Sequence, residues 1–162
     1  MVKGHLRMAF FISVVTCLMF GSFSEARQYL FDCLPVFQHV GASAYNPDLS
    51  KTQRMLDAVG NPHAGLKCIH VAGTNGKGSC SHMLAAILQS AGYRTGLFTS
   101  PHMKSVTERI RVNGIEISEA DFTEVVNELL PSLQTESPSF FEATVGIAFL
   151  QFRKAEIGRA HV

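Results

Sequence analysis

The residues of this chain best suited to chemistry lie in a glycine-rich segment, Gly73–Ser79, with the sequence GTNGKGS. A triphosphate needs backbone N–H groups that converge on its oxygens, and glycine lets the chain approach that closely. Lys77 supplies a mobile cation for the β- and γ-phosphates, and Ser79 offers a hydroxyl to phosphate or magnesium. The segment therefore predicts ATP binding by Gly73, Thr74, Asn75, Gly76, Lys77, Gly78 and Ser79.

This segment departs in two places from the common phosphate-loop pattern, in which a Gly-Lys pair is followed at once by Ser or Thr. Val71 stands where the first glycine belongs, and Gly78 separates Lys77 from the hydroxyl of Ser79. A glycine-rich turn that carries a surface lysine is the alternative. The strand pattern before the segment and the helix pattern after it favour the nucleotide site, with Lys77 as its candidate catalytic residue.

The flanking segments predict a strand–helix–strand unit. Lys67–Ala72 is a short apolar run typical of a buried strand, and the residues after the glycines show apolar positions at helical spacing up to Gly92. Arg94–Thr99 then predicts a second strand, which implies a parallel pair. We therefore expect an α/β fold of the P-loop type, with a mostly parallel sheet and flanking helices.

Further elements are predicted on both sides of this unit. Arg109–Ile117 is expected to form a hairpin around an Asn-Gly turn, and Ser118 begins a helix that should end before Pro131. The other expected helices are Gln28–Phe37, a helix capped by Ser50 and closed by Gly60, and a last helix from Ser139 to about Lys154.

Composition sets limits on the function. The 162 residues suffice for one domain with a sizeable core, and 46% hydrophobic with 17% charged residues is a globular balance. The formal net charge of +1 gives no sign of a nucleic-acid partner. The four cysteines form no Cys-x-x-Cys pair and the seven histidines are scattered, so neither predicts a metal site.

The first 26 residues differ from the rest of the chain. A basic start precedes an apolar run, Met8–Phe20, and the small residues Ser24 and Ala26 follow, as in a secretory signal. The run is short for a membrane span, so no stable span is expected. Translated upstream sequence, with Met19 as the true start, is the alternative. Because a secreted enzyme would meet little ATP, we expect a cytoplasmic protein, with secretion as the other possibility.

The last residues, 157–162, resemble the translation of a sequencing adapter, and we expect them to be an artefactual tail. Residues 27–156 then form the expected ATP-binding domain. Its last helix should lead into a further strand, so we expect a truncated gene product.

Four motifs in order carry a family resemblance: Ile69–Ser79, Ala91–Tyr93, Thr99–His102 and Glu108–Gly114. Together they resemble folylpolyglutamate synthase, a family that is often bifunctional with dihydrofolate synthase and belongs to the Mur ligase superfamily. The resemblance runs from about Tyr29 to Glu156 and covers only the N-terminal part of the family's central ATPase domain.

The resemblance implies a reaction and its cofactors. Such ligases use ATP to phosphorylate a carboxylate, and the amine of L-glutamate then attacks the acyl phosphate. It implies that Ser100 and Glu142 bind Mg²⁺, although Ser100 could also be a loop hydroxyl and Glu142 completes a capping box with Ser139. The family's histidine ligand, modified lysine and glutamate-binding domain have no counterpart here, so turnover by this chain alone is not expected.

The resemblance also places Ala44 and Tyr45 in a folate-contacting loop, which the sequence alone describes equally well as a flexible surface loop. Arg109 and Arg111 should share one side of a strand, facing either an anionic substrate or solvent. The implied partners are folate or dihydropteroate, L-glutamate and ATP, bound by a monomer. The competing hypotheses are a non-catalytic nucleotide-binding fragment, a P-loop kinase and a Mur-type ligase of cell-wall precursors.

Overall fold

A computed structural model describes residues 19–35 and 48–158 of the chain. The predictions for Ala44 and Tyr45, and for most of the two chain ends, lie outside these residues. The helices are α2 (Phe23–Cys33), α4 (Ser50–Ala58), α5 (Lys77–Ser90), α6 (Glu119–Glu136) and α7 (Phe140–Lys154), with a short 3₁₀ helix, η2, at Val106–Arg109. The strands are β1 (Gly96–Phe98), β2 (Ile110–Val112) and β3 (Ile115–Glu116).

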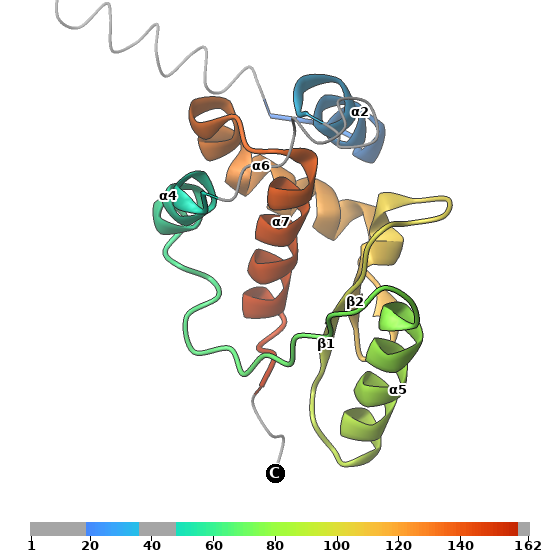
Figure 1. Cartoon of the computed structure of the whole chain (residues 1–162). Coiled ribbons are helices and arrows are strands. Elements are labelled where there is room, and N and C mark those ends of the chain that lie inside the picture. The colour runs from blue at the N-terminus through green and yellow to red at the C-terminus, as the bar shows by residue number, and fades with distance from the viewer. Residues whose placement is uncertain (1–18, 36–47, 159–162) are drawn as a thin grey trace, which may run out of the picture.

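The strands form one antiparallel sheet in the order β1-β2-β3, and β1 lies between α7 and α5 (Figure 1). Phe98 faces Ile110 across the first pair of strands. The hairpin between β2 and β3 turns at Asn113 and Gly114, whose φ angles of 50° and 79° are those a tight hairpin turn requires. The α/β class and the Asn-Gly hairpin predicted from the sequence are therefore confirmed.

The predicted strand at Lys67–Ala72 is wrong for the described structure. This segment forms no ladder with any described strand, and the parallel pair expected between it and the segment that contains β1 is absent from the described sheet. Backbone hydrogen bonds to a neighbour define a strand, and β1 pairs only with β2 among the described residues. Without such a neighbour, Ile69 remains 64% exposed.

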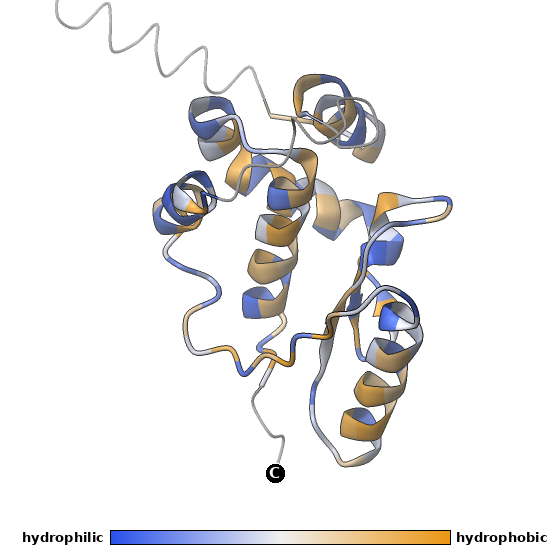
Figure 2. Ribbon diagram, in the orientation of Figure 1, coloured by the Kyte–Doolittle hydropathy of each residue, from blue (hydrophilic) through white to orange (hydrophobic). Residues whose placement is uncertain are grey.

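The hydrophobic core lies where α6 and α7 pack on each other and on α2 and α4. Figure 2 shows hydrophobic residues along α6 and α7. The fully buried side chains of the two helices include Phe122, Val125, Val126, Leu129, Ile147 and Leu150. These two long helices therefore carry most of the core, and α7 also contacts β1.

The expected end of α6 before Pro131 is also wrong, because the helix continues through this residue to Glu136. A proline inside a helix removes one backbone hydrogen bond. Leu129, Leu130 and Leu133 are nevertheless all buried around it. Burial of apolar side chains on both sides of the proline offsets the lost bond, which is why the local signal fails here.

Serine side chains cap three of the described α-helices. Ser118 and Ser139 cap α6 and α7 as predicted, and Ser22 caps α2, which begins at Phe23 rather than Gln28. The prediction of Ser50 as the cap of α4 is wrong, because its hydroxyl donates to Asp48 and Leu49 holds the cap position. In α2 the capping box joins Ser22 and Glu25, and the next residue, Ala26, is fully buried.

A close contact between β1 and α7 gives the first testable prediction. A Cβ on Gly96 would lie 2.7 Å from Cδ1 of the Phe152 ring, which is itself buried. Gly96→Ala should therefore lower the free energy of unfolding by about 1–3 kcal/mol, measured by urea denaturation.

The control is Gly78→Ala, because a Cβ at that position of α5 meets no described atom within 4 Å. Alanine is a better helix former than glycine, so this control should leave stability unchanged or raise it by up to about 1 kcal/mol. Equal stability of the Gly96→Ala variant and the unsubstituted chain would contradict the contact.

Candidate functional site

The glycine-rich loop leads directly into α5. Gly76 occupies the N-cap position with a φ of 78°, a left-handed conformation that glycine adopts without strain. Among the described residues no side chain caps this helix end, and residues 73–79 are all exposed. The first N–H groups of α5 and the positive end of its dipole are thus open to an anion.

Lys77 folds back over the loop. Its Nζ donates to the backbone carbonyl oxygens of Gly73 and Thr74, the second at 3.0 Å. The side chain is exposed, so its ammonium can exchange these carbonyl oxygens for phosphate oxygens by rotating about its own bonds. The loop thus holds a cation directly beside the uncapped helix end, which is the arrangement that a phosphate group requires.

A second loop, Thr99–Ser105, follows β1 and contains Ser100 and His102. Arg109 lies beneath it and is only 6% exposed. Its Nη1 donates to Oγ of Ser100 at 3.1 Å, and its Nε donates to Nδ1 of His102 at 2.8 Å. The guanidinium carbon lies 5.2 Å from the centre of the Phe140 ring. Ser100 therefore accepts a hydrogen bond from a buried cation.

Burial and the neighbouring charge keep His102 neutral. Burial lowers the pKa of His102, and the positive charge of Arg109 lowers it further. Burial also lowers the pKa of Arg109. Since Nδ1 of His102 accepts from Arg109, the proton of the neutral ring is on Nε2.

The expectation that Arg109 and Arg111 share one side is wrong. Arg109 belongs to η2, where the backbone does not alternate, and points to Ser100 and His102. Arg111 lies in β2, where its side chain donates to Glu116 at 2.6 Å and to the carbonyl oxygen of Gly114. Only Arg109 therefore reaches the loop after β1.

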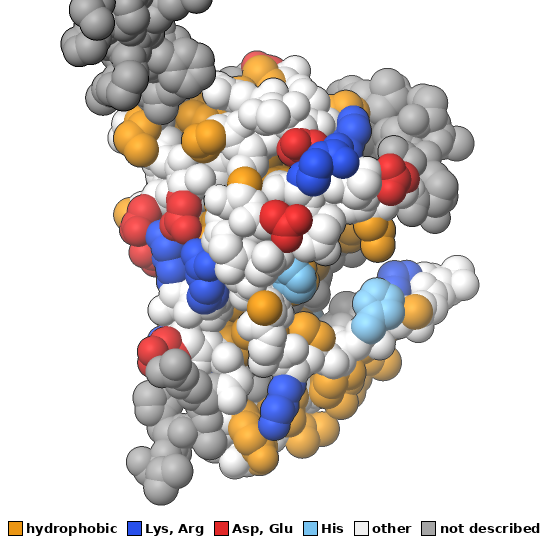
Figure 3. All heavy atoms as spheres, turned by 90° about the vertical axis from the view of Figure 1, so that its left-hand side faces the viewer, with side chains coloured by type: hydrophobic (Ala, Val, Ile, Leu, Met, Phe, Trp, Pro, Cys, Tyr) orange, Lys and Arg blue, Asp and Glu red, His pale blue; other side chains and the backbone are white. Residues whose placement is uncertain are grey.

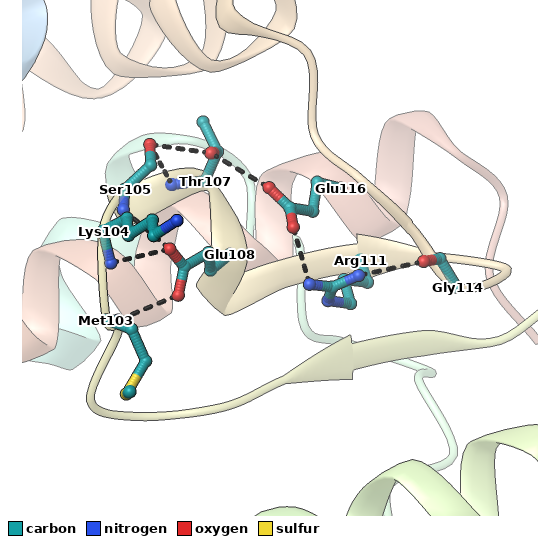
Figure 4. Close-up of polar contacts among 8 residues, drawn as sticks. All are labelled: Met103, Lys104, Ser105, Thr107, Glu108, Arg111, Gly114 and Glu116. Carbon is teal, nitrogen blue, oxygen red and sulfur yellow. Dashed lines mark hydrogen bonds and ion pairs between the residues drawn. The ribbon is translucent and has the colours of Figure 1, made fainter.

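Glu108 binds the backbone of the same loop (Figure 4). Its carboxylate accepts three backbone N–H bonds, from Met103 at 2.8 Å, Lys104 at 2.7 Å and Ser105 at 2.8 Å. These bonds lower the pKa of Glu108 to about 2. Sequence reasoning missed this role, although the spacing of Ser105 and Glu108 matches a capping box and could have indicated it.

Glu142 lies at the start of α7 and is engaged by two side chains. Its Oε2 accepts from the backbone N–H and the hydroxyl of Ser139 at 2.8 and 2.7 Å, and its Oε1 accepts from the Thr52 hydroxyl at 2.7 Å. Burial raises the pKa of Glu142, but the hydrogen bonds outweigh it and the pKa lies below its usual value. Glu142 is therefore ionised near neutral pH.

Ser100 and Glu142 have the donor chemistry that magnesium requires. Mg²⁺ prefers oxygen ligands and is often held by one or two protein groups together with water and phosphate oxygens. Among the described residues, Ser100 Oγ and Glu142 Oε1 each accept a single hydrogen bond, which leaves a lone pair on each oxygen. Arg109 connects the segments that carry these two residues. It donates a hydrogen bond to Ser100 and stacks on Phe140, which lies two residues before Glu142.

The rest of the described surface adds three facts. Within residues 19–35 and 48–158, no three His, Cys, Asp or Glu side chains are grouped to hold a metal ion, and no helix has the length and apolarity to cross a membrane. Large hydrophobic side chains are exposed at Ile69 and, on α5, at Met83 and Ile87. Figure 3 shows exposed hydrophobic side chains over the lower part of the face it presents.

The fold and the site together define a class of protein: an α/β unit with a glycine-rich loop at the uncapped start of a helix. No family model matches the chain. Among curated proteins, it is 37% identical over 140 residues to the dihydrofolate synthase/folylpolyglutamate synthase of Bacillus subtilis, covering 83% of this chain and 31% of that protein.

Solved structures that are similar to this chain include enzymes of the same kind. The folylpolyglutamate synthase of Thermotoga maritima matches with a TM-score of 0.73 and 37% identity, over 83% of this chain and 31% of that one. E. coli FolC in complex with DHPP and ADP matches with a TM-score of 0.73 and 28% identity, over 85% and 31%. The chain thus spans about a third of the length of these proteins.

Over most of its length, therefore, this chain is similar to folylpolyglutamate and dihydrofolate synthases, and it is consistent with a fragment of that Mur ligase-family enzyme.

Proposed function

We propose that this chain is the nucleotide-binding part of an ATP-dependent, ADP-forming ligase that adds L-glutamate to tetrahydrofolyl-(poly)glutamate or to dihydropteroate. The observation that carries the proposal is the glycine-rich loop, which presents Lys77 beside the uncapped start of α5. The E. coli neighbour, which holds DHPP and ADP, supports a nucleotide site that works together with a second small-molecule substrate.

The reaction proceeds in two steps in this proposal. A carboxylate oxygen of the pterin substrate attacks the γ-phosphorus of ATP, which gives an acyl phosphate and ADP. The glutamate amine then attacks the acyl carbon, loses a proton, and releases inorganic phosphate as the amide forms. Both steps need cationic groups and N–H donors around the transferred phosphoryl group, which Lys77 and the loop supply.

Each proposed residue has a defined part. The backbone N–H groups of the loop and of the first turn of α5 hold the phosphates, and Ser79 adds its hydroxyl. Ser100 and Glu142 are the proposed protein ligands of Mg²⁺, an ion that would neutralise phosphate charge when bound. Ala44 and Tyr45 are the proposed contacts of the folate, in a segment outside the described residues.

We further propose a cytoplasmic, monomeric protein whose substrates are small molecules, with no nucleic-acid partner. The second candidate is a non-catalytic nucleotide-binding fragment. The exposed apolar side chains of Ile69, Met83 and Ile87 favour it for the chain by itself, because a catalytic domain normally covers such a face. A P-loop kinase and a Mur-type ligase of cell-wall precursors are the remaining alternatives.

A chimera tests the ligase assignment. This chain would replace the matching part of the Bacillus subtilis relative, and incorporation of labelled glutamate into tetrahydrofolate and dihydropteroate would be measured with and without ATP. ATP-dependent product on either pterin is the expected result. Nucleotide binding by a cooperatively folded chimera that makes no product on either pterin would refute the folate assignment and favour the non-catalytic candidate.

A further inference from the structure

Two consecutive residues, Glu108 and Arg109, bind the loop Thr99–Ser105. Glu108 binds its backbone at Met103, Lys104 and Ser105. Arg109 binds its side chains at Ser100 and His102. Together these contacts engage the loop from Ser100 to Ser105.

The bonds to Glu108 are of a kind that only a carboxylate makes well. Two oxygens receive three N–H donors at 2.7–2.8 Å, Met103 on one oxygen and the other two on its partner (Figure 4). A glutamine amide has one acceptor oxygen, and its NH₂ group would face a backbone N–H donor. Ionisation also strengthens each bond, since hydrogen bonds to a charged acceptor are about twice as strong as neutral ones.

The guanidinium of Arg109 has several partners at the point where it meets the loop. Its guanidinium is buried and stacked on Phe140, the first residue of α7, and it directs two different nitrogens at Ser100 and His102. A planar fork with fixed donors orients two acceptors at once, which a lysine ammonium cannot do with the same geometry. The contact of Arg109 with Phe140 connects the loop to α7, the helix that contains Glu142.

We propose that Glu108 and Arg109 are positioning residues for the proposed magnesium ligand Ser100: Glu108 fixes the backbone of the loop, and Arg109, stacked on Phe140 of α7, fixes the Ser100 hydroxyl. The inference rests on the proposed function, in which Ser100 binds the metal. Outer partners of a metal ligand normally orient it, and their loss weakens metal binding by about 10- to 100-fold.

The test uses the full chain and Mn²⁺ as a spectroscopic substitute for Mg²⁺. Binding of Mn²⁺ is titrated by electron paramagnetic resonance with the non-hydrolysable ATP analogue AMPPCP present, and AMPPCP affinity is measured separately without metal. Amide hydrogen exchange across residues 99–105 is followed by NMR. The variants are Glu108→Gln and Arg109→Lys, with Glu116→Gln and Arg111→Lys as matched controls from the neighbouring hairpin, whose side chains bind each other.

Glu108→Gln should speed exchange at residues 103–105 by about tenfold or more, since each lost bond is to a charged group. Both Glu108→Gln and Arg109→Lys should weaken Mn²⁺ binding by about tenfold or more. The affinity for AMPPCP without metal and the amide exchange in α6 and α7 should stay unchanged. Both controls should match the unsubstituted chain. Unchanged Mn²⁺ affinity in both variants, or an equal effect in the controls, would overturn the proposal.

A Ser100→Ala variant separates this inference from the function on which it rests. If Ser100→Ala weakens Mn²⁺ binding and the Glu108 and Arg109 variants do not, the positioning roles are wrong and the metal assignment stands. If Ser100→Ala leaves Mn²⁺ binding unchanged, the metal assignment itself is wrong and the inference is overturned with it.

Discussion

Lys77→Ala is expected to reduce ATP-dependent glutamate incorporation in the chimera by about 10²–10³-fold, the loss seen when one preorganised charge-stabilising group is removed from a transition state. Lys77 is the cation placed at the uncapped end of α5, and it already lies within reach of the loop carbonyls. No other lysine or arginine belongs to the loop Gly73–Ser79, so none is positioned in sequence to replace it.

The measurement is product formation under saturating glutamate, with ATP varied so that effects on binding and on turnover are separated. Lys67→Ala serves as the control, because this lysine is exposed and lies outside the loop. The Lys67 variant should match the unsubstituted chimera. Equal activity of the Lys77 variant would show that the loop does not handle the phosphates.

Phe122→Ala is expected to have the largest effect on stability, a loss of about 3–5 kcal/mol in the free energy of unfolding. Phe122 has no exposed surface, and its ring meets that of Phe23 edge to face at a centroid distance of 5.4 Å. Whole domains are stable by only about 5–15 kcal/mol, so this single cavity removes a large share of the total.

Urea denaturation followed by circular dichroism measures this loss, with Phe141→Ala as the control. Phe141 is 52% exposed, so the same change of residue type removes much less buried surface there. The control should cost well under half as much as Phe122→Ala. Equal losses at the two positions would show that Phe122 does not lie in the core.

Local signals predicted most of the elements in this fold. The hairpin around Asn113 follows from backbone chemistry within a few residues, and so do the caps at Ser118 and Ser139. The errors occur where distant parts of the chain decide the outcome. Lys67–Ala72 has the composition of a strand but no strand beside it, and α6 passes Pro131 because its flanking leucines are buried.

In the candidate site, too, the features set by local sequence could be predicted and those set by distant contacts could not. The glycine-rich loop lies at the start of a helix as predicted, because glycine, lysine and the following apolar spacing are all local signals. The role of Arg109 depends on contacts with Ser100, His102 and Phe140, which no alternation rule could supply. The metal roles of Ser100 and Glu142 stay predictions, as do the folate contacts of Ala44 and Tyr45.

The capping box of α2 bears on the order of events during biosynthesis. A processing protease cleaves extended backbone, whereas Ser24–Ala26 form part of the first turn of α2, with Ala26 inside the core. A cut after Ala26 would separate Ser22 and Glu25 from the helix they cap. Secretion with cleavage there would thus have to precede folding, and the folded chain should resist a signal peptidase at this bond.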